Sequence, residues 1–484
     1  MVSTTRAAYT SAIPPPGKRP HSITVFGCTG NAGRGVAYHA IKSSVLKQNN
    51  NNDKHNVRIA LSGRNRSKVQ KVLEGIHDEL QKEGIQSKPS NNEIEIIVAD
   101  ANDEQSMLNL AQSTDILISC AGPFARYGEA AVRACVEART HYVDIAGEEA
   151  WVSRMISDYG AVAEERGVTL CPFGGYDCVP AELGMYLVGE ALESMTKGEE
   201  GGGGGATKSL GTLELNFRGT KGGFPRGTIE TILDSLEGKV PQRKEGDVRF
   251  YPKQFRSVAK EALSTSHWLI PRYQMGQFTG PNFMSVINVP VMCRTASTLG
   301  YSNNISIHDK SVFGGRPSLM NGYGLLGTQL YIATLFVGGM ALALPPVRAY
   351  LRRKMKNYGF DGNPSGKVYL DARGVSADET RSALARCVVP GDAGIYATGL
   401  LAAGVANALH EAITSSTTTT ASSATDGIGM PLAGFHAPVA ALHTCRRGLL
   451  VDHLKGMGVD ISVRVVPEGG VAKELDATTL RSKL

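Results

Sequence analysis

Short apolar runs alternate with longer stretches of helical periodicity over the first 171 residues. The apolar runs predict strands at 23–26, 57–61, 94–98, 115–120, 142–144 and 168–171. The stretches between them predict helices at 33–46, 67–81, 104–111 and 129–138. This alternation is typical of a parallel sheet that is covered by helices on both faces. We therefore predict an α/β protein with an N-terminal, Rossmann-type doubly wound parallel sheet over residues 21–190.

The pattern changes beyond residue 206. Residues 213–217 and 461–466 alternate apolar and polar positions, as half-buried strands do, and 368–372 resembles them. Residues 228–236 and 399–412 have helical periodicity instead. These elements predict a second, α+β domain over 206–470.

One segment of the second domain, residues 317–347, contains no charged side chain, and its centre at 330–344 is strongly apolar. Arg348, Arg352 and further basic residues follow it. A bilayer span needs about 20 apolar residues. Three interpretations stay open: a buried core helix, a helix that lies on a membrane or lipid monolayer, and a membrane span.

Several stretches predict exposed, irregular chain. Residues 48–54, 198–205 and 414–425 are low in complexity and have almost no apolar side chains to bury. Residues 1–20 combine prolines with basic residues and lack the apolar core of a secretory signal, so we expect a disordered tail. We expect a second tail at 471–484.

The last three residues, Ser482-Lys483-Leu484, form a signal that the peroxisomal import receptor reads at a chain end. They predict a peroxisomal protein and that receptor as a partner. The alternative is a chance tripeptide on a frayed terminus.

Charge and composition exclude several classes of function. The 51 Lys and Arg nearly balance the 45 Asp and Glu, and no basic stripe interleaved with aromatics indicates a nucleic-acid partner. The eight cysteines form no CxxC pair, so we expect reduced structural thiols and no metal site. Glycine is in excess, with 56 residues, and part of that excess lies in one motif.

That motif, GCTGNAG at 27–33, has the spacing GxxGxxG and stands between the first predicted strand and the first predicted helix. Gly27 permits a tight turn, Gly30 lets the backbone approach a pyrophosphate, and Gly33 lets helix and strand pack closely. The amides at the helix N-terminus meet phosphate charge. We predict that Gly27, Thr29, Gly30, Asn31 and Gly33 bind a dinucleotide.

The end of the second strand selects the cofactor. An acidic residue there would bind the ribose of NAD, but this chain reads LSGRNRSK at 61–68. Arg64 and Arg66 are suited to a 2′-phosphate, which predicts NADP(H). The alternative for Arg66 is a place on the solvated first turn of the next helix.

The ends of the next two strands complete the predicted cofactor site. Asp100 would face the adenine, and the segment of Cys120, Ala121 and Gly122 would run beside the ribose and nicotinamide.

Several motifs, in their order and spacing, resemble the saccharopine dehydrogenase-like oxidoreductases. They are GCTGNAG, SGRNRSKVQKVL, ISCAGPFARYGEAAVRAC, HYVDIAGE and FGGYDCVPAELG. The family includes trans-acting enoyl reductases of mycobacteria and animal proteins found with lipid droplets. The resemblance implies a second domain that binds substrate and forms a homodimer.

Two candidate catalytic residues follow the predicted strands. Tyr127 would donate a proton or a hydrogen bond to the substrate, or pack as an aromatic whose hydroxyl is satisfied. Asp144 would face the cleft as an acid, base or substrate anchor, or cap a helix. Arg126 is a candidate for an anionic substrate group, and Asp177 is a candidate cap for the helix near residue 180.

Together these observations predict an NADPH-dependent, enoyl-reductase-like enzyme with a hydrophobic, acyl or lipid-type substrate. Two alternatives stay open. One is a non-catalytic Rossmann protein of lipid droplets or membranes, and the other is an imine-reducing dehydrogenase of the saccharopine type.

Overall fold

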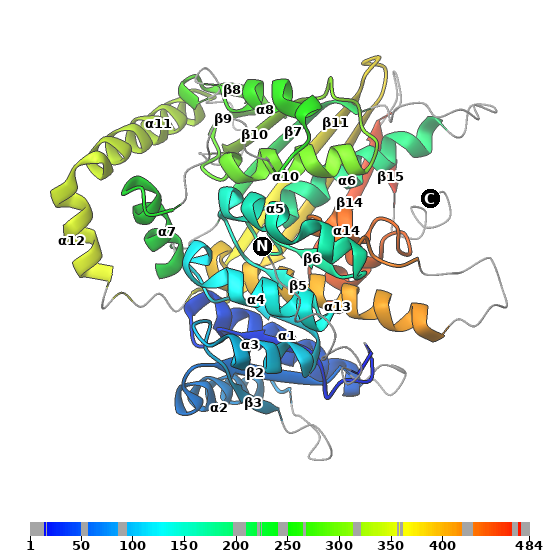
Figure 1. The fold of residues 1–484 in the computed structure, drawn as a ribbon. Helices are drawn as coiled ribbons and strands as arrows, with labels where there is room; N and C mark the ends of the chain where they lie inside the picture. Colours follow the sequence, from blue (N-terminus) through cyan, green and yellow to red (C-terminus); the bar gives the residue numbers. More distant parts are fainter. Residues whose placement is uncertain are drawn as a thin grey trace.

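The structure is a computed structural model. It describes residues 14–15, 17–49, 57–85, 94–196, 210–219, 223, 225–240, 250–264, 268–312, 321–355, 358, 362–418, 429–466 and 473–475. Within these ranges the chain forms two sheets, with a pair of helices reaching away from the second one (Figure 1). The inserts at 48–54, 198–205 and 414–425 and the terminal Ser482-Lys483-Leu484 lie largely or wholly outside the described residues.

The first sheet is parallel throughout and has the order β13-β6-β5-β4-β1-β2-β3. Its strands are β1 (His21–Phe26), β2 (Ile59–Gly63), β3 (Glu95–Val98), β4 (Thr114–Ser119), β5 (His141–Asp144), β6 (Thr169–Cys171) and β13 (Gly434–Phe435). The connecting helices are α1 (Asn31–Asn49), α2 (Arg66–Lys82), α3 (Glu104–Gln112), α4 (Phe124–Ala138) and α5 (Glu149–Glu165).

Helices cover both faces of this sheet. Along β4, Ile116 and Ile118 enter the core on the side of α1 and α2, whereas Leu117 enters the core on the side of α3 and α4. All residues of β1, β2 and β4 are buried. The predicted doubly wound α/β fold is therefore confirmed.

The C-terminal part of the chain returns to complete the first domain. β13 pairs with β6, and α13 (Thr398–Thr418) packs along α1. A Cβ on Gly399 would lie 2.3 Å from the carbonyl carbon of Gly35, so only small residues allow this close packing. The predicted range 21–190 thus holds six of the seven strands of this sheet.

The second sheet is mixed, and its order is β15-β14-β12-β11-β7-β10-β9-β8. Its strands are β7 (Leu210–Gly219), β8 (Arg272–Gln274), β9 (Gln277–Pro281), β10 (Ser306–Val312), β11 (Lys367–Ser376), β12 (Ser382–Pro390), β14 (Asp460–Val466) and β15 (Lys473–Leu475). The further helices are α6 (Val179–Thr196), η1 (Lys253–Phe255), α8 (Arg256–Ala262), α10 (Ser285–Thr298), η2 (Ala393–Ala397), α14 (Pro438–Leu442) and α15 (Leu449–Gly456).

α6 and α10 lie on one face of the second sheet, which confirms the predicted α+β arrangement. A Cβ on Gly184 of α6 would meet Leu370, Ala372 and Leu215 of the sheet. β11 alternates buried and less buried positions along its length, as the sequence pattern predicts for a strand with one covered face.

Two helices, α11 (Asn321–Ala343) and α12 (Pro345–Met355), form an arm at the left of Figure 1. α11 begins against β9, where Thr328 is buried and the Tyr331 ring packs on Gly280. It then leaves the body, and α12 returns toward α7 (Arg226–Leu236). We call α11 and α12 the arm below.

The boundary predicted for the N-terminal tail is wrong at its inner end. Arg19 is buried, and its guanidinium donates to the carbonyls of Thr114 at 2.7 Å and Ala138 at 2.8 Å. A guanidinium has five donors, so it can tie α4 and β4 together from the edge of the sheet. The folded domain therefore begins before residue 20.

Candidate cofactor and substrate site

The GCTGNAG motif forms the turn between β1 and α1. Gly27 has a φ of +81°, and its amide donates to the Ser62 carbonyl at 2.9 Å. A Cβ on Gly27 would lie 2.9 Å from the Ala121 nitrogen, and one on Gly33 would lie 2.2 Å from the Gly27 carbonyl oxygen. Both positions require glycine, because the atoms that a Cβ would meet belong to the backbone and cannot move aside as the end of a flexible side chain can.

The tip of this turn is open, in contrast to its base. Thr29 and Gly30 are exposed, and Asn31 begins α1. The space around the tip and the backbone amides at the N-terminus of α1 fit a pyrophosphate. The residues predicted from the motif therefore form one cradle that suits a dinucleotide.

The two predicted arginines have different surroundings. Arg66 lies in the first turn of α2 and donates to the Ile96 carbonyl at 2.9 Å, so its guanidinium is held by β3. Arg64 is exposed and has no hydrogen-bond or ion-pair partner among the described residues. A Cβ on Gly63 would lie 3.8 Å from the Thr29 methyl group, which puts the Arg64 backbone beside the phosphate turn. Arg64 is thus the side chain free to bind a 2′-phosphate.

Asp100 lies just after β3, as predicted, but its carboxylate accepts hydrogen bonds from within its own turn. Its Oδ1 accepts from the backbone and the side-chain nitrogen of Asn102, at 3.0 and 3.1 Å. The structure therefore gives Asp100 a role in shaping this loop.

The segment after β4 meets the phosphate turn. The Cys120 amide donates to the Phe26 carbonyl at 2.8 Å, and Ala121 lies against Gly27. Gly122 is exposed. Burial raises the pKa of the Cys28 thiol to about 12 and that of Cys120 further, so neither thiol is a nucleophile near neutral pH.

α4 begins at Phe124, five residues earlier than the predicted helix start at 129. Its N-terminus is capped by Glu148, whose carboxylate accepts from the Phe124 and Ala125 amides, each at 2.8 Å. The helix cap that the sequence suggested for Asp144 is therefore supplied by Glu148. Tyr127 lies in the first turn of this helix, half-buried, and its hydroxyl has no partner among the described residues.

Arg126, in contrast, is occupied. Its guanidinium is 2.5 Å from the carboxylate of Asp234 on α7. The other oxygen of Asp234 pairs with Arg352 of the arm at 2.7 Å. The suggestion that Arg126 holds an anionic substrate group is not supported, because a buried carboxylate already neutralises it.

Asp144 does not face an open cleft. It is 0% exposed, and its carboxylate accepts from the Ala146 and Phe173 amides and from the Tyr142 hydroxyl, at 2.9 to 3.0 Å. Burial raises the pKa of Asp144 to about 7. Because its partners are Tyr142 of β5 itself and the amides of Ala146 and Phe173 in the loops after β5 and β6, Asp144 ties these two loops to the strand.

Asp177 lies in the loop after β6 and is not a helix cap. It is half-buried, and its carboxylate has no hydrogen-bond partner among the described residues. A Cβ on Gly147 would lie 3.5 Å from its Oδ2, so the carboxylate reaches the loop that follows β5. Residue spacing in the motif does not indicate that this carboxylate lacks a hydrogen-bond partner among the described residues.

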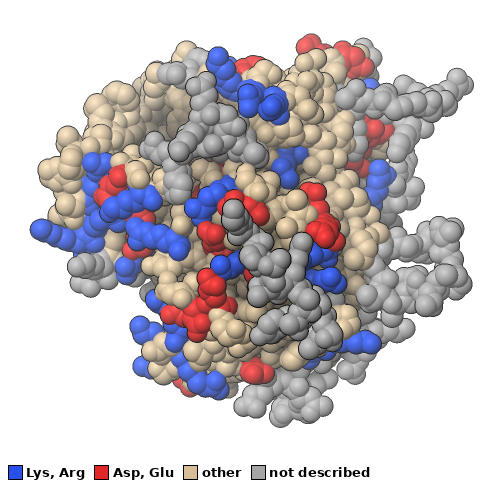
Figure 2. Space-filling model, in the orientation of Figure 1, with Lys and Arg blue, Asp and Glu red and all other residues tan. Residues whose placement is uncertain are grey.

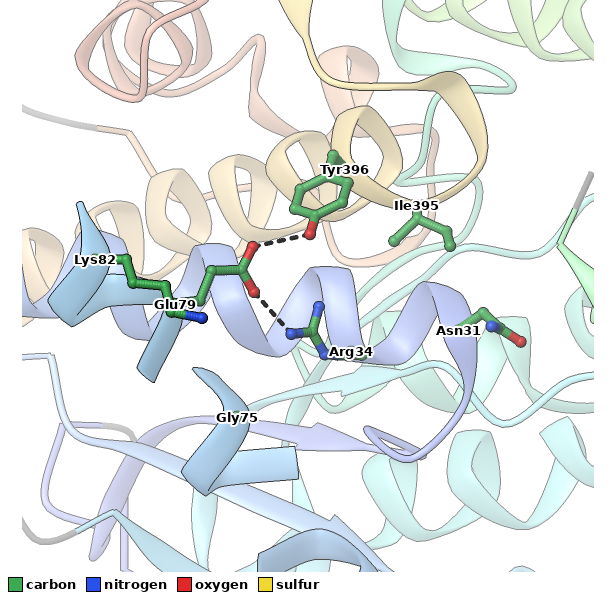
Figure 3. A pocket seen from close by; sticks show the side chains of 7 residues that line it. All are labelled: Asn31, Arg34, Gly75, Glu79, Lys82, Ile395 and Tyr396. Carbon is green, nitrogen blue, oxygen red and sulfur yellow. Dashed lines mark hydrogen bonds and ion pairs between the residues drawn. The ribbon is translucent and has the colours of Figure 1, made fainter. Parts of the chain in front are cut away.

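A pocket of about 400 Å³ touches the phosphate turn at Asn31 (Figure 3). Inside it, the Glu79 carboxylate accepts from Arg34 at 2.7 Å and from the Tyr396 hydroxyl at 2.8 Å. These three residues come from α1, α2 and η2 and were not singled out in the sequence. They join the cofactor helix to the returning C-terminal part of the chain.

The described residues contain no cluster of His, Cys, Asp and Glu that suits a metal ion.

Comparisons with known proteins agree with this geometry. Residues 23–171 match the family model of the saccharopine dehydrogenase NADP-binding domain. A lipid droplet localized protein of Caenorhabditis elegans is 27% identical over 342 residues, which cover 70% of this chain and 71% of that protein. A saccharopine dehydrogenase-like oxidoreductase of mouse is 30% identical over 35% of this chain and 37% of that one.

The comparisons also found a further relative and a solved structure. A Mycobacterium tuberculosis protein that carries the name of a trans-acting enoyl reductase is 29% identical over 45% of each chain. The solved structure of yeast saccharopine dehydrogenase (L-Glu forming) covers 92% of this chain and 100% of its own, with 13% identity and a TM-score of 0.44. The predicted family resemblance and the NADP cofactor are confirmed by the matched domain. The chain spans less than half the length of the mouse and mycobacterial relatives.

Proposed function

We propose that this chain, an NADP-dependent oxidoreductase of the saccharopine dehydrogenase type, reduces a hydrophobic, acyl-type substrate at a lipid surface. The observation that carries the proposal is the combination, in one chain, of an NADP-binding domain and an arm whose apolar side chains are exposed. NADPH supplies a hydride when it is bound. The residues of this chain orient it, exclude water and provide the proton.

The arm supports the choice of a hydrophobic substrate. Only 6% of the apolar span Gly324–Ala343 is buried, and Leu330 and Phe336 are 70% and 60% exposed. A buried core helix would bury most of such a span, so that interpretation is wrong. A large exposed apolar patch marks an interaction site. The apolar span of this helix has 20 residues, which is about the length that a bilayer requires.

Charge favours a lipid surface over a span. Figure 2 shows Lys and Arg gathered over α12, beside the almost uncharged surface of α11. Basic groups beside an apolar helix match lipid headgroups beside acyl chains. α12 also returns to the body, where Arg352 pairs with Asp234 and Glu237. Because the arm is attached to the body at both ends, it is better suited to lie on a monolayer or in one leaflet than to cross a bilayer.

Within the site, we assign two predicted residues to different tasks. Tyr127, whose hydroxyl is unpartnered among the described residues, hydrogen-bonds the polar group of the substrate. Asp144 acts through the loops that it holds, because its carboxylate is buried and fully engaged. Replacing Tyr127 with Phe is expected to lower turnover and leave NADPH affinity unchanged.

The test of the reaction uses two substrates. We expect purified protein to oxidise NADPH with trans-2-hexadecenoyl-CoA in phosphatidylcholine vesicles, and to be inactive with lysine plus a 2-oxo acid. Turnover with the amino-acid pair would favour the imine-reducing alternative. NADPH binding without turnover of either substrate would favour the non-catalytic lipid-surface protein.

The cellular location is a separate part of the proposal. Ser482-Lys483-Leu484 supports recognition by the peroxisomal import receptor, and the C. elegans relative supports lipid-droplet association through the arm. A reporter fused to the N-terminus should leave peroxisomes when these three residues are removed. It should leave lipid droplets when 330–344 is deleted. An unchanged distribution would contradict the corresponding assignment. Self-association as a homodimer stays a prediction.

A further inference from the structure

Three carboxylates with different surroundings lie at the end of β5 and in the loops that follow β5 and β6. Glu148 caps α4 and also accepts from the Thr231 hydroxyl at 3.2 Å. Asp144 accepts three hydrogen bonds and is fully buried. Asp177 has no partner among the described residues. The structure therefore leaves one of these three groups available for chemistry.

The backbone around Asp177 is built closely enough to hold it in place. The Phe173 amide donates to the Asp144 carboxylate at 3.0 Å, and the Tyr176 amide donates to the Thr398 hydroxyl at 3.3 Å. A Cβ on Gly175 would lie 3.0 Å from the Thr398 methyl group. The loop is thus held by Asp144 of β5 and by Thr398 of α13, while the Asp177 carboxylate has no hydrogen-bond partner among the described residues.

The position of this loop matches the substrate end of the site. In open parallel sheets, ligands bind outside the carboxyl ends of the strands. Asp177 follows β6 and reaches Gly147, which follows β5. On the other side, Ile287 of α10 approaches Gly147, and the Tyr176 ring packs edge-on against Phe217 of β7. Asp177 therefore lies where the first domain meets the second.

We propose that Asp177 is the catalytic acid of this site, donating the proton that complements the hydride supplied by NADPH. This inference rests on the proposed reductase function. For a conjugated C=C bond, the hydride adds to the β-carbon and the π electrons move to the α-carbon. The Asp177 carboxyl gives its proton to the α-carbon and becomes a carboxylate, which water then reprotonates. One NADPH and one proton are consumed for each bond reduced.

The titration of Asp177 suits this role. Burial raises the pKa of Asp177 to about 6, so a protonated fraction persists near neutral pH. Among the described residues, the titratable groups that interact with Tyr176 and Cys178 of this loop are all acids or thiols. Besides Asp177 they are Asp144 on β5, Glu182 on α6, Asp309 on β10 and Cys387 on β12.

Except for Asp177, each buried carboxylate in this set is engaged. Glu182 accepts from Thr295 and from the Val439 and Ala440 amides, and Asp309 accepts from Asn282 and Asn288. Replacing Asp177 alone therefore removes one titrating group and breaks no hydrogen bond among the described residues.

The decisive experiment measures binding and needs no substrate. The dissociation constants of NADP⁺ and NADPH are measured from pH 5.5 to pH 8, and their ratio is followed. The 2′-phosphate titrates in this range too, but it is common to both forms and cancels in the ratio. A carboxylate beside the nicotinamide favours the oxidised, positively charged ring. We expect the ratio of the NADP⁺ constant to the NADPH constant to fall about tenfold as Asp177 ionises.

Three variants complete the experiment. Asp177→Asn is expected to give a flat ratio, and Asp177→Glu is expected to restore the fall. Asp158→Asn, which changes an exposed carboxylate on α5, is the matched control and should behave as wild type. A flat wild-type profile, or an unchanged fall in Asp177→Asn, would overturn the assignment.

The turnover number of the variants provides a second, independent test. With the enoyl substrate, Asp177→Asn should lose about 10²- to 10⁴-fold in kcat while NADPH binding persists. If the wild type turns over neither substrate, the reductase proposal fails, and the binding profile still decides whether Asp177 faces the nicotinamide.

Discussion

The phosphate turn and the arm are both rich in small and apolar residues, yet the protein uses them in opposite ways. At the turn, Gly27 and Gly33 let backbones approach so closely that a Cβ would overlap a neighbour. On the arm, Gly338 and Gly339 have nothing within 4 Å of a Cβ. Internal contacts determine the turn, whereas most of the apolar span of the arm is exposed and makes few contacts with the rest of the protein. Disrupting each region should therefore have a different consequence.

The largest effect is expected at the turn. Gly33→Ala puts a Cβ 2.2 Å from the Gly27 carbonyl oxygen, so the turn must shift. We expect a loss of about 3 kcal/mol in the free energy of unfolding. We also expect NADPH affinity to fall more than about 100-fold, as fluorescence titration would measure. Gly456→Ala, at a position with open space, is the matched control. Equal behaviour of the two variants would refute the role of close packing.

The arm should give the reverse result. The double change Leu330→Glu and Phe336→Glu alters two exposed side chains. It should leave the free energy of unfolding within about 0.5 kcal/mol of wild type. Lipid-vesicle binding in a flotation assay should fall about 100-fold, because two large apolar groups no longer enter the acyl region. A stability loss like that of a core variant would show that the arm is part of the fold.

Extraction separates the two remaining interpretations of the arm. A helix that lies on the surface is released from vesicles by alkaline carbonate, whereas a spanning helix stays in the pellet. Release would agree with the proposed surface location, and retention would favour the span.

A smaller effect at the turn concerns cofactor choice. Arg64→Ala removes an exposed guanidinium that has no partner among the described residues, so stability should not change. NADPH affinity should fall about tenfold, because one charge-assisted contact to the 2′-phosphate is lost. NADH affinity should stay the same. Arg66→Ala, by contrast, should affect stability, because Arg66 donates to the Ile96 carbonyl. If Arg66→Ala alone lowers NADPH affinity, the two assignments are reversed.

The smallest effect is expected where the arm meets the body. Arg352 lies 2.8 Å from Glu237, and the pKa of Glu237 falls to about 2 beside Arg352 and Lys239. A carboxylate with a lowered pKa stabilises the folded state fully above its ordinary pKa and loses that contribution as the pH falls through about 2. The pair is only partly buried, so its contribution is small and sensitive to salt. Arg352→Gln should speed hydrogen exchange in α12 without changing global unfolding. Unchanged exchange in α12 would argue against a tether.

Most of the first sheet could be predicted because its signals are local. Buried strands such as Ile59–Gly63 contain short apolar runs, and the phosphate turn carries its own glycines. The start of α4 could not be predicted, because its cap is Glu148, which comes 24 residues later in the chain. β13 could not be predicted either, because it is only two residues long and most of the second domain separates it from β6 in the sequence.

The candidate site was predicted less well than the fold. Motif spacing placed Asp144 near the carboxyl end of a strand and made Asp177 a candidate helix cap, but spacing does not reveal which hydrogen bonds are already made. Asp144 is engaged and Asp177 is unpartnered among the described residues, and that difference depends on residues far apart in sequence. The same holds for the arm. An apolar run predicts a helix, but it does not show whether that helix is buried or exposed.

The most direct test of the account joins its two regions in one measurement. NADPH oxidation is followed with trans-2-hexadecenoyl-CoA in vesicles and with the soluble trans-2-butenoyl-CoA, for wild type and for the Leu330→Glu, Phe336→Glu variant. We expect wild type and variant to oxidise NADPH at equal rates with the soluble substrate. With the substrate in vesicles, we expect only the wild type to oxidise NADPH. A variant that keeps the full vesicle rate, or a wild type that is inactive with both substrates, would contradict the claim of a reductase that works at a lipid surface.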